Sequence, residues 1–245
     1  MKQVRRVHAA GVSSSTYHVT QTSDGRPVTE PSPRPGIPAG LLASGVVAIA
    51  RRLTADSAPQ VADALAAGGV LAFEITLNEP VDVALRAIES VARRSPDQAI
   101  GAGTVLSIDA GRRALDAGAT FLVMPHTDPE IVAWAAARGV PTLPGAATPS
   151  EVLAAWRAGA AAVKVFPASV VGPAFVRECR GPFPDIPLVP SGGVTAEAAA
   201  DFIRAGAVAV GVGSWLIGDA APEGLTARAR RIVDLVARAR ADRPG

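Results

Sequence analysis

The 245-residue sequence lacks the features that mark secreted, membrane and nucleic-acid-binding proteins. Cys179 is its one cysteine, so no disulfide can form within the chain, which suits a reducing cytoplasm. We interpret Cys179 as a small packing residue. No apolar run reaches the roughly 18 residues of a membrane-spanning helix. The net charge is +2 and no five like charges follow one another, so neither nucleic acid nor a membrane surface is indicated as a partner.

Residues suited to binding a metal or a nucleotide are also scarce. Beyond residue 40, His126 is the one histidine, and no Asp, Glu and Cys residues cluster at metal-ligand spacing. His126 follows a predicted strand and is either a rim residue or faces the site. No G-x-G-x-x-G motif opens a helix after a strand. We therefore expect no cofactor and no metal.

The first 40 residues differ in composition from the rest. Residues 1–36 are rich in Ser, Thr and Pro and show no hydrophobic periodicity, so we expect residues 1–40 to be a disordered extension. The start is basic, but no apolar segment follows as in a secretory signal. A dispensable tail, a start codon assigned too early and an organelle transit peptide remain open alternatives.

From Gly45 onward, the chain repeats a short apolar run, a polar turn and an alanine-rich amphipathic stretch. The runs are nearly continuous in apolar residues, which is typical of parallel strands buried on both faces. They predict eight strands: Gly45–Ala50, Val70–Ile75, Ala99–Gly103, Phe121–Met124, Pro141–Leu143, Ala161–Phe166, Pro187–Val189 and Val208–Val212. Eight strand–helix units predict an α/β fold, a single-domain (β/α)8 TIM barrel over residues 41–245.

Lys164 is a charged residue inside an apolar predicted strand. Apart from Lys2, it is the only lysine, and every other cationic side chain that stays charged is Arg. Arginine cannot act as an amine nucleophile, whereas a desolvated lysine can lose its proton and attack a carbonyl. Lys164 is thus a candidate nucleophile, and the alternative is a structural lysine that reaches the rim or pairs with a carboxylate.

Glu74 is likewise a charge inside an apolar predicted strand. Active sites of barrels of this kind lie at the carboxyl ends of the strands. A carboxylate there can relay protons if burial raises its pKa toward neutrality. The alternative is a buried ion pair that serves structure alone.

Other strand ends carry groups suited to binding an anionic ligand. Thr104 offers a hydroxyl, although Thr is also a frequent helix N-cap. Arg51 or Arg52 could bind a carboxylate or a phosphate, and the alternative is that both are plain surface residues. Glycine-rich turns follow the last two predicted strands, where barrels usually bind phosphate through backbone N–H groups and a helix N-terminus. These turns contain Ser191, Gly192, Gly193, Gly211, Gly213 and Ser214.

Together these motifs resemble the 2-keto-3-deoxy-6-phosphogluconate (KDPG/KHG) aldolase family over roughly residues 41–240. The resemblance rests on segments that occur in the family's order. They are Glu74-Ile-Thr-Leu, Gly101-Ala-Gly-Thr-Val-Leu106, Leu143-Pro-Gly145, Lys164-Val-Phe-Pro167, Gly192-Gly-Val194 and Gly213-Ser214.

The resemblance implies a cytoplasmic class I aldolase that needs no metal and forms a homotrimer. It would cleave a 2-dehydro-3-deoxy-6-phospho sugar acid to pyruvate and D-glyceraldehyde 3-phosphate. The implied catalytic residues are Lys164 as Schiff-base lysine and Glu74 as general acid/base. The implied substrate-binding residues are Arg51 for the carboxylate, Thr104 for the pyruvate part, Phe166 beside the imine, and Gly192, Gly193, Gly213 and Ser214 for the phosphate.

The substrate's configuration at C4 is the least determined feature. The segment Leu77-Asn78-Glu79-Pro80 and the pair Gly172-Pro173 resemble the 6-phosphogalactonate branch, since the phosphogluconate branch has Arg at the position of Asn78. We therefore favour the galactonate substrate, with the gluconate type and 4-hydroxy-2-oxoglutarate as alternatives. A phosphate-binding isomerase or transferase, and a non-catalytic sugar-phosphate sensor, are the rival functions.

Overall fold

The structure is a computed structural model that describes residues 20–21, 27–28, 34–78, 80–95, 97–218 and 222–242. Contacts divide the chain into two units, Met1–Ser32 and Pro33–Gly245. In the first unit, β1 (Thr20–Gln21) pairs antiparallel with β2 (Pro27–Val28). The other residues before Arg34 lie outside the described residues, so the predicted disorder there stays a prediction.

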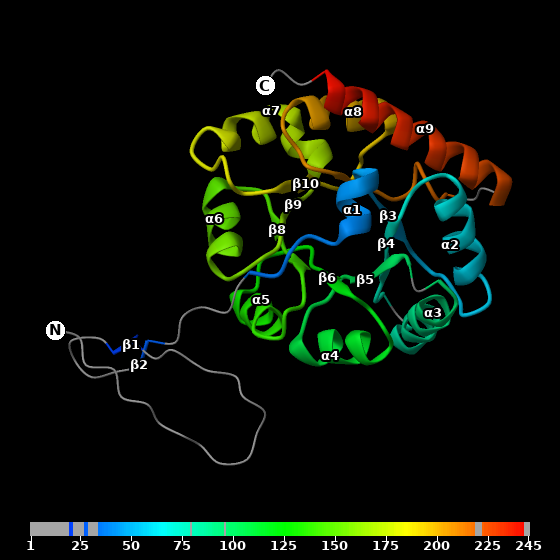
Figure 1. Cartoon of the computed structure of the whole chain (residues 1–245), viewed down its shortest axis with the longest axis horizontal. Helices are drawn as coiled ribbons and strands as arrows, with labels where there is room; N and C mark the ends of the chain where they lie inside the picture. The colour runs from blue at the N-terminus through cyan, green and yellow to red at the C-terminus, as the bar shows by residue number, and fades with distance from the viewer. Residues whose placement is uncertain are drawn as a thin grey trace, which may run out of the picture. The chain divides into compact units, whose positions relative to one another are not determined.

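The second unit is a curled parallel sheet surrounded by helices (Figure 1). One set of strands has the order β11-β3-β4-β5-β6-β7 and the other β10-β9-β8, and neighbouring strands within each set are parallel. The strands are β3 (Val46–Ala50), β4 (Ala72–Thr76), β5 (Ala99–Gly103), β6 (Phe121–Val123), β7 (Thr142–Leu143), β8 (Gly145–Ala146), β9 (Val163–Val165), β10 (Leu188–Pro190) and β11 (Val210–Val212). The predicted α/β class and the parallel, buried strands are confirmed.

The predicted fifth strand, Pro141–Leu143, corresponds to β7, and a second short strand that the sequence did not predict, β8, follows it after Pro144. Before Pro144, β7 pairs with β6; after Pro144, β8 pairs with β9. Proline has no N–H to donate to a strand ladder, so the chain changes partner there. The Pro144 carbonyl accepts a hydrogen bond from the Lys164 N–H at 2.9 Å. At the other side, a parallel bridge between Ser191 and Gly211 links the ends of β10 and β11.

Nine helices are described in the second unit, and most lie on the outside of the sheet (Figure 1). Four of them begin at a Ser, Thr or Asp whose side chain accepts a hydrogen bond from the first turn, as at Thr148, where Glu151 completes a capping box. The helices are α1 (Ala39–Ser44), α2 (Ala58–Ala67), α3 (Val81–Arg94), α4 (Ile108–Asp116), α5 (Pro129–Ala136), α6 (Pro149–Arg157), α7 (Ala168–Arg180), α8 (Ala196–Arg204) and α9 (Pro222–Ala241).

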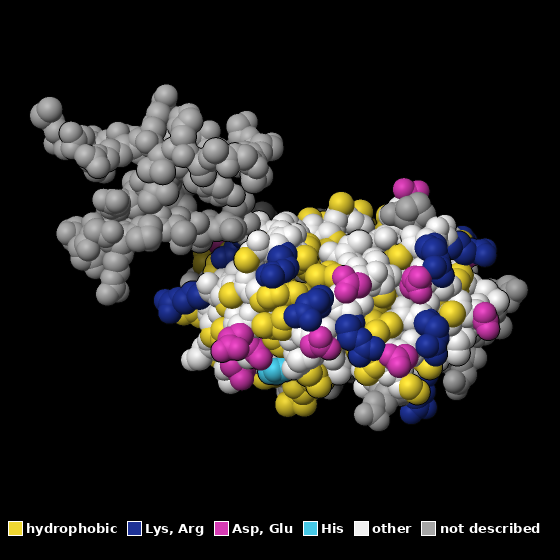
Figure 2. All heavy atoms as spheres, turned by 90° about the horizontal axis from the view of Figure 1, so that it is seen from below, with side chains coloured by type: hydrophobic (Ala, Val, Ile, Leu, Met, Phe, Trp, Pro, Cys, Tyr) yellow, Lys and Arg dark blue, Asp and Glu magenta, His cyan; other side chains and the backbone are white. Residues whose placement is uncertain are grey.

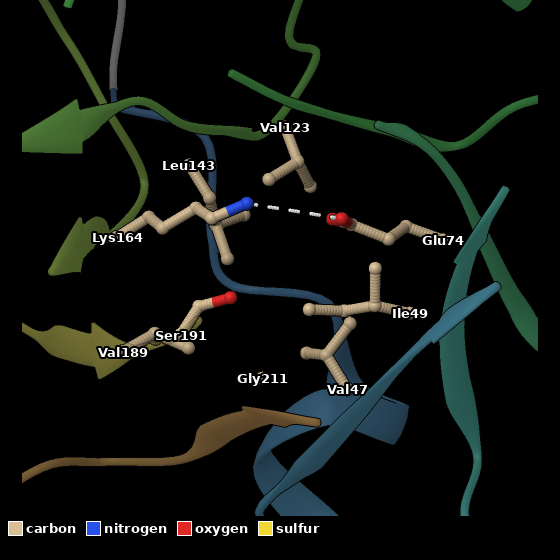
Figure 3. Close-up of a pocket in the computed structure, with 9 residues that line it drawn as sticks. All are labelled: Val47, Ile49, Glu74, Val123, Leu143, Lys164, Val189, Ser191 and Gly211. Atoms are coloured by element: carbon tan, nitrogen blue, oxygen red, sulfur yellow. Dashed lines mark ion pairs between the residues drawn. The ribbon is translucent and has the colours of Figure 1, made fainter. Parts of the chain in front are cut away.

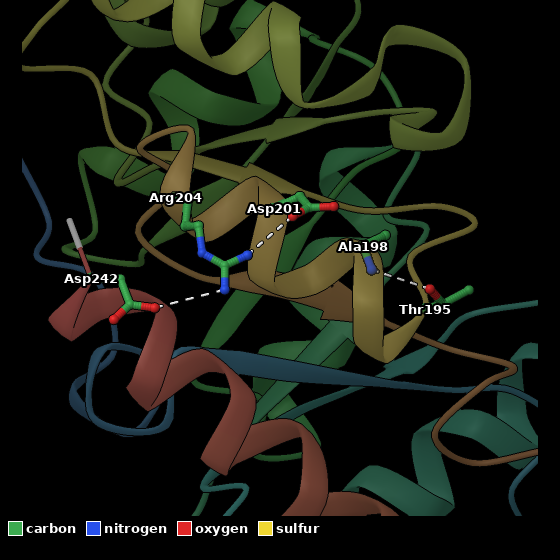
Figure 4. Close-up of polar contacts among 5 residues, drawn as sticks. All are labelled: Thr195, Ala198, Asp201, Arg204 and Asp242. Atoms are coloured by element: carbon green, nitrogen blue, oxygen red, sulfur yellow. Dashed lines mark hydrogen bonds and ion pairs between the residues drawn. The ribbon is translucent and has the colours of Figure 1, made fainter.

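Polar contacts occur within α8, and one exposed ion pair links α8 to the residue that follows α9 (Figure 4). Arg204 pairs with Asp201 at 3.1 Å and with Asp242 at 3.7 Å, and Thr195 caps α8 by accepting the Ala198 N–H. On the face shown in Figure 2, basic and acidic side chains are interspersed rather than gathered by sign. No helix of the described residues is both long enough and apolar enough to cross a membrane.

Apolar side chains fill the interior of the curled sheet toward one end. This interior cluster comprises Leu41, Val47, Ala72, Phe121, Val123, Leu143, Ala162, Val189 and Ala209. Leu41 is fully buried and comes from α1, a short helix that the sequence reading did not predict. A second, larger apolar layer lies between strands and helices. The packed interior leaves the carboxyl ends of the strands as the place for a site.

Candidate active site

Lys164 on β9 and Glu74 on β4 point toward each other across the interior of the sheet (Figure 3). The Lys164 Nζ lies 3.8 Å from the Glu74 Oε1, and the two side chains are 10% and 3% exposed. The two charges predicted inside separate strands are thus one buried pair. At this distance the amine and the carboxyl group form an ion pair, and a small movement of either side chain would bring them within hydrogen-bond reach for proton transfer.

The surroundings of this pair are mostly apolar. They form a cavity lined by Val47, Ile49, Glu74, Val123, Leu143, Lys164, Val189, Ser191 and Gly211. Burial raises the pKa of Glu74 above its ordinary 4.5, and the positive charges of Lys164 and Arg51 oppose this rise. Burial therefore moves the titration of Glu74 in the direction that an acid/base near neutral pH requires.

Gly103 makes room for the Glu74 carboxylate. A methyl group added at Gly103 would lie 2.8 Å from the Glu74 Oε1, well inside an ordinary contact. The next residue, Thr104, has a φ of 59°, which a non-glycine residue rarely adopts. Such backbone strain is concentrated at functional sites. Thr104 is half-buried and directly follows β5, the strand that pairs with β4 beside Glu74.

Phe166 lies beside the lysine and contacts a glycine turn. The Lys164 Nζ is 5.2 Å from the centroid of the Phe166 ring. A methyl group added at Gly192 would come within 2.9 Å of the same ring. Phe166 therefore lies close both to the amine and to the turn that follows β10.

The two predicted phosphate-binding turns lie next to each other. Gly192 and Gly193 have φ values of 92° and 74°, which favour glycine, and they follow β10, whereas Gly213 and Ser214 follow β11. The bridge between Ser191 and Gly211 joins the two strand ends immediately before these turns.

Ser191 was named in the sequence only as part of a glycine-rich turn, and the structure places it in the cavity beside Lys164 and Glu74. Its side chain points into the cavity in Figure 3, and its hydroxyl is buried without a hydrogen-bond partner among the described residues. A buried hydroxyl without a partner is costly, so a ligand or water in the cavity would satisfy it. The available signal was a polar residue that ends an apolar strand before a glycine pair.

Of the predicted site residues, Lys164 and Glu74 line the cavity. The substrate-binding residues predicted from the resemblance are not among its lining residues: Arg51, Thr104, Phe166, Gly192, Gly193, Gly213 and Ser214. His126 and Asn78 are both exposed and are not among the residues that line the cavity. Among the described residues, no three His, Cys, Asp or Glu side chains are grouped so that they could hold a metal ion.

The sequence model of the family described as "KDPG and KHG aldolase" matches residues 39–225. The chain belongs to this aldolase family. The predicted family is thus confirmed, and with it the class of enzyme, a carbon–carbon lyase.

Individual relatives within the family include members of both branches. A 2-dehydro-3-deoxy-phosphogluconate aldolase of Pseudomonas aeruginosa is 42% identical over 64% of this chain and 71% of its own length. A probable 2-dehydro-3-deoxy-6-phosphogalactonate aldolase of Rhizobium meliloti is 39% identical over 70% of this chain and 81% of its own. The two identities are too similar to assign the branch.

A solved relative carries the family's chemistry. It is the KDPG aldolase of Legionella pneumophila with pyruvate captured at low pH as a covalent carbinolamine intermediate. It is 28% identical to this chain with a TM-score of 0.69, and the match covers 88% of this chain and 99% of that one.

Proposed function

We propose that this protein is a class I aldolase that cleaves a 2-dehydro-3-deoxy-6-phospho sugar acid to pyruvate and D-glyceraldehyde 3-phosphate. The observation that carries the proposal is the buried Lys164 amine facing the buried Glu74 carboxyl group. A lysine amine can attack a carbonyl carbon to form an imine, and a carboxyl group beside it can supply and remove the protons of that reaction.

The reaction begins at the C2 ketone of the substrate. The Lys164 nitrogen attacks C2 to give a carbinolamine, and loss of water, with Glu74 supplying the proton, leaves a protonated imine. A base removes the proton of the C4 hydroxyl, the C3–C4 bond breaks, and its electrons move into the imine as an enamine. Glyceraldehyde 3-phosphate leaves, C3 is protonated, and water hydrolyses the imine to release pyruvate. Covalent attachment thus replaces one difficult step with several easier ones.

The remaining site residues would orient the substrate. Arg51, at the carboxyl end of β3, would bind the substrate carboxylate. Thr104 would bind the pyruvate part, and Phe166 would pack beside the imine and exclude water. The turns after β10 and β11 would bind the phosphate through Gly192, Gly193, Gly213 and Ser214. Glycine turns allow an anion to approach backbone N–H groups closely, which supports this assignment.

We also propose that the curled sheet is a closed (β/α)8 barrel. The bridge between Ser191 and Gly211 supports closure on one side, and the single residue Pro144 between β7 and β8 supports it on the other. In a closed barrel, β7 and β8 are two halves of one bent strand, which gives the eight strands that the sequence predicts.

We further propose a homotrimer that works in the cytoplasm, with residues 1–40 as an extension outside a domain of residues 41–245. Leu106 after β5 and Val170 in the first turn of α7 are 57% and 78% exposed, and a neighbouring subunit would cover such apolar side chains. A reducing compartment suits a chain with the single cysteine Cys179. Sedimentation of the full chain tests the trimer.

Release of pyruvate, followed by coupled lactate dehydrogenase, tests the activity. The 6-phosphogalactonate and 6-phosphogluconate forms of the substrate differ at C4 and are compared side by side, with 4-hydroxy-2-oxoglutarate as a third substrate. We expect the galactonate form to be preferred, on the resemblance around Asn78 and Gly172. Binding of these acids without any pyruvate release would instead identify a sugar-phosphate sensor. The Lys164→Met variant is the inactive control.

A further inference from the structure

Thr76 is the last residue of β4, two positions after Glu74. Side chains alternate along a strand, so Thr76 points to the same side of the sheet as Glu74. That side is the interior, because Glu74 lines the cavity and Ala72, two positions earlier, belongs to the interior cluster. Thr76 is only 4% exposed. It therefore occupies the interior layer next to Glu74, at the end of the sheet where the active sites of such folds lie.

The strand registers place Thr76 between two residues that the proposed function assigns to the substrate. In the pairing of β3 with β4, Ala50 lies opposite the residue before Thr76, so Arg51 follows at the level of Thr76. On the other side, Thr76 lies opposite Gly103, which directly precedes Thr104. Arg51 and Thr104 thus flank Thr76 at the ends of the two neighbouring strands.

The two branches of the Thr76 side chain have different neighbours. Its hydroxyl donates a hydrogen bond to the Ala50 carbonyl at 3.3 Å, and this bond is buried. That carbonyl belongs to the peptide group from which Arg51 begins, so the hydroxyl fixes the base of the Arg51 side chain. The methyl group of Thr76 faces Gly103, where an added methyl group would lie 3.1 Å from it and 2.8 Å from the Glu74 Oε1. One branch thus contacts the strand of Arg51, and the other packs on the side of Glu74.

We propose that Thr76 is a positioning residue that holds the Arg51 guanidinium in the orientation that binds the carboxylate of the keto acid. The assignment rests on the proposed function, in which Arg51 binds that group. A guanidinium binds a carboxylate through two parallel hydrogen bonds, which demand a fixed orientation. The Arg51 side chain is exposed and forms no hydrogen bond or ion pair with another described residue. Its orientation therefore depends on the peptide group that Thr76 holds.

The concentration dependence of pyruvate capture by borohydride separates binding from chemistry. The half-saturating concentration of pyruvate reports its binding, and the maximal rate of capture reports imine formation at Lys164. Thr76→Val keeps the branched shape but lacks the hydroxyl, Thr76→Ala lacks both branches, and Thr76→Ser keeps the hydroxyl. The matched control is Thr120→Val, because the Thr120 hydroxyl likewise donates to a carbonyl of a neighbouring strand, that of Ile100, at 3.1 Å. Thr120 directly precedes β6 and so lies at the opposite end of the sheet.

In Thr76→Val and Thr76→Ala we expect the half-saturating pyruvate concentration to rise about 3- to 10-fold, as for the loss of one hydrogen bond, while the maximal rate changes by less than about 2-fold. Thr76→Ser and Thr120→Val should keep the wild-type value. Arg51→Gln should raise it about 10- to 100-fold, as for the loss of hydrogen bonds to a charged group. Adding Thr76→Val to Arg51→Gln should cause no further rise, because two residues that act as one unit are not additive.

Three results would overturn the assignment. One is a half-saturating concentration in Thr76→Val equal to that of the wild-type protein. Another is a lower maximal rate with unchanged half-saturation, which would place Thr76 at the chemistry of Glu74 instead. The third is a full additional rise in the double variant, which would show that Thr76 acts independently of Arg51. Failure of the proposed function is a separate outcome, since the wild-type protein itself would then capture no pyruvate and the assignment would fall with it.

Discussion

Substitution of Gly103 by Ala tests whether the placement of the Glu74 carboxylate controls the reaction. The added methyl group would lie 2.8 Å from the Glu74 Oε1 and 3.0 Å from its Cδ. Gly103 does not have a positive φ, so Ala fits its backbone and the only conflict is with side chains. Restoring an ordinary contact of 3.4 Å requires the carboxylate to move by about 0.6 Å.

A displacement of this size changes the 3.8 Å separation of Glu74 and Lys164 by a substantial fraction. Misplacement of a catalytic group by 1 Å can reduce a rate by about 10²-fold, so we expect kcat to fall about 10- to 100-fold. Pyruvate capture at Lys164 should persist, because the amine is unchanged. The assay is coupled pyruvate release, with Gly181→Ala as control, since its methyl group meets only an ordinary 3.5 Å contact. An unchanged kcat in Gly103→Ala would refute the role given to the carboxylate's position.

Three further predictions concern the acid/base group and the packed interior. Glu74→Gln should keep most of the pyruvate capture but lose about 10²- to 10⁴-fold in turnover, and equal turnover would remove Glu74 from the mechanism. Because burial raises the pKa of Glu74 above 4.5, its carboxylate form is lost as the pH falls toward this raised pKa, and kcat should fall with it. The positive charge of Arg51 lowers the pKa of Glu74, so Arg51→Gln should shift the acid limb of the kcat profile to higher pH. A shift to lower pH would contradict the electrostatic argument. Leu41→Ala should lower the free energy of unfolding by about 2–5 kcal/mol in denaturant titrations, because Leu41 is fully buried in the interior cluster. A loss below about 0.5 kcal/mol would mean that α1 does not pack against the interior cluster of the sheet.

Local sequence patterns predicted most of the strands because buried parallel strands are continuous in apolar residues. The predicted strand Ala99–Gly103 coincides with β5. The predicted strand at Ala161 begins two residues before β9, because regular pairing with β10 starts only at Val163 and regular pairing with β8 only at Lys164. Boundaries depend on pairing with other strands, which the local pattern does not contain.

The features that the sequence did not reveal depend on contacts between distant residues. Helix α1 is too short for a periodic pattern, and its Leu41 is buried only because the curled sheet surrounds it. The change of strand partner at Pro144 follows from the curvature of the sheet.

The candidate site shows the same division. Lys164 and Glu74 were visible as charges in apolar strands, but their separation of 3.8 Å required the fold. The closeness of Arg51 to Gly213 was not visible in the sequence for the same reason, since it depends on the pairing of β3 with β11.

The most direct test of the central claim is the mass of the protein after treatment with pyruvate and borohydride. The buried Lys164 amine must form an imine with the keto acid, so one reduced pyruvyl group should be added, and peptide mapping should locate it at Lys164. Lys164→Met should take up none. No added mass in the wild-type protein, or a label at the only other lysine, Lys2, would contradict the account.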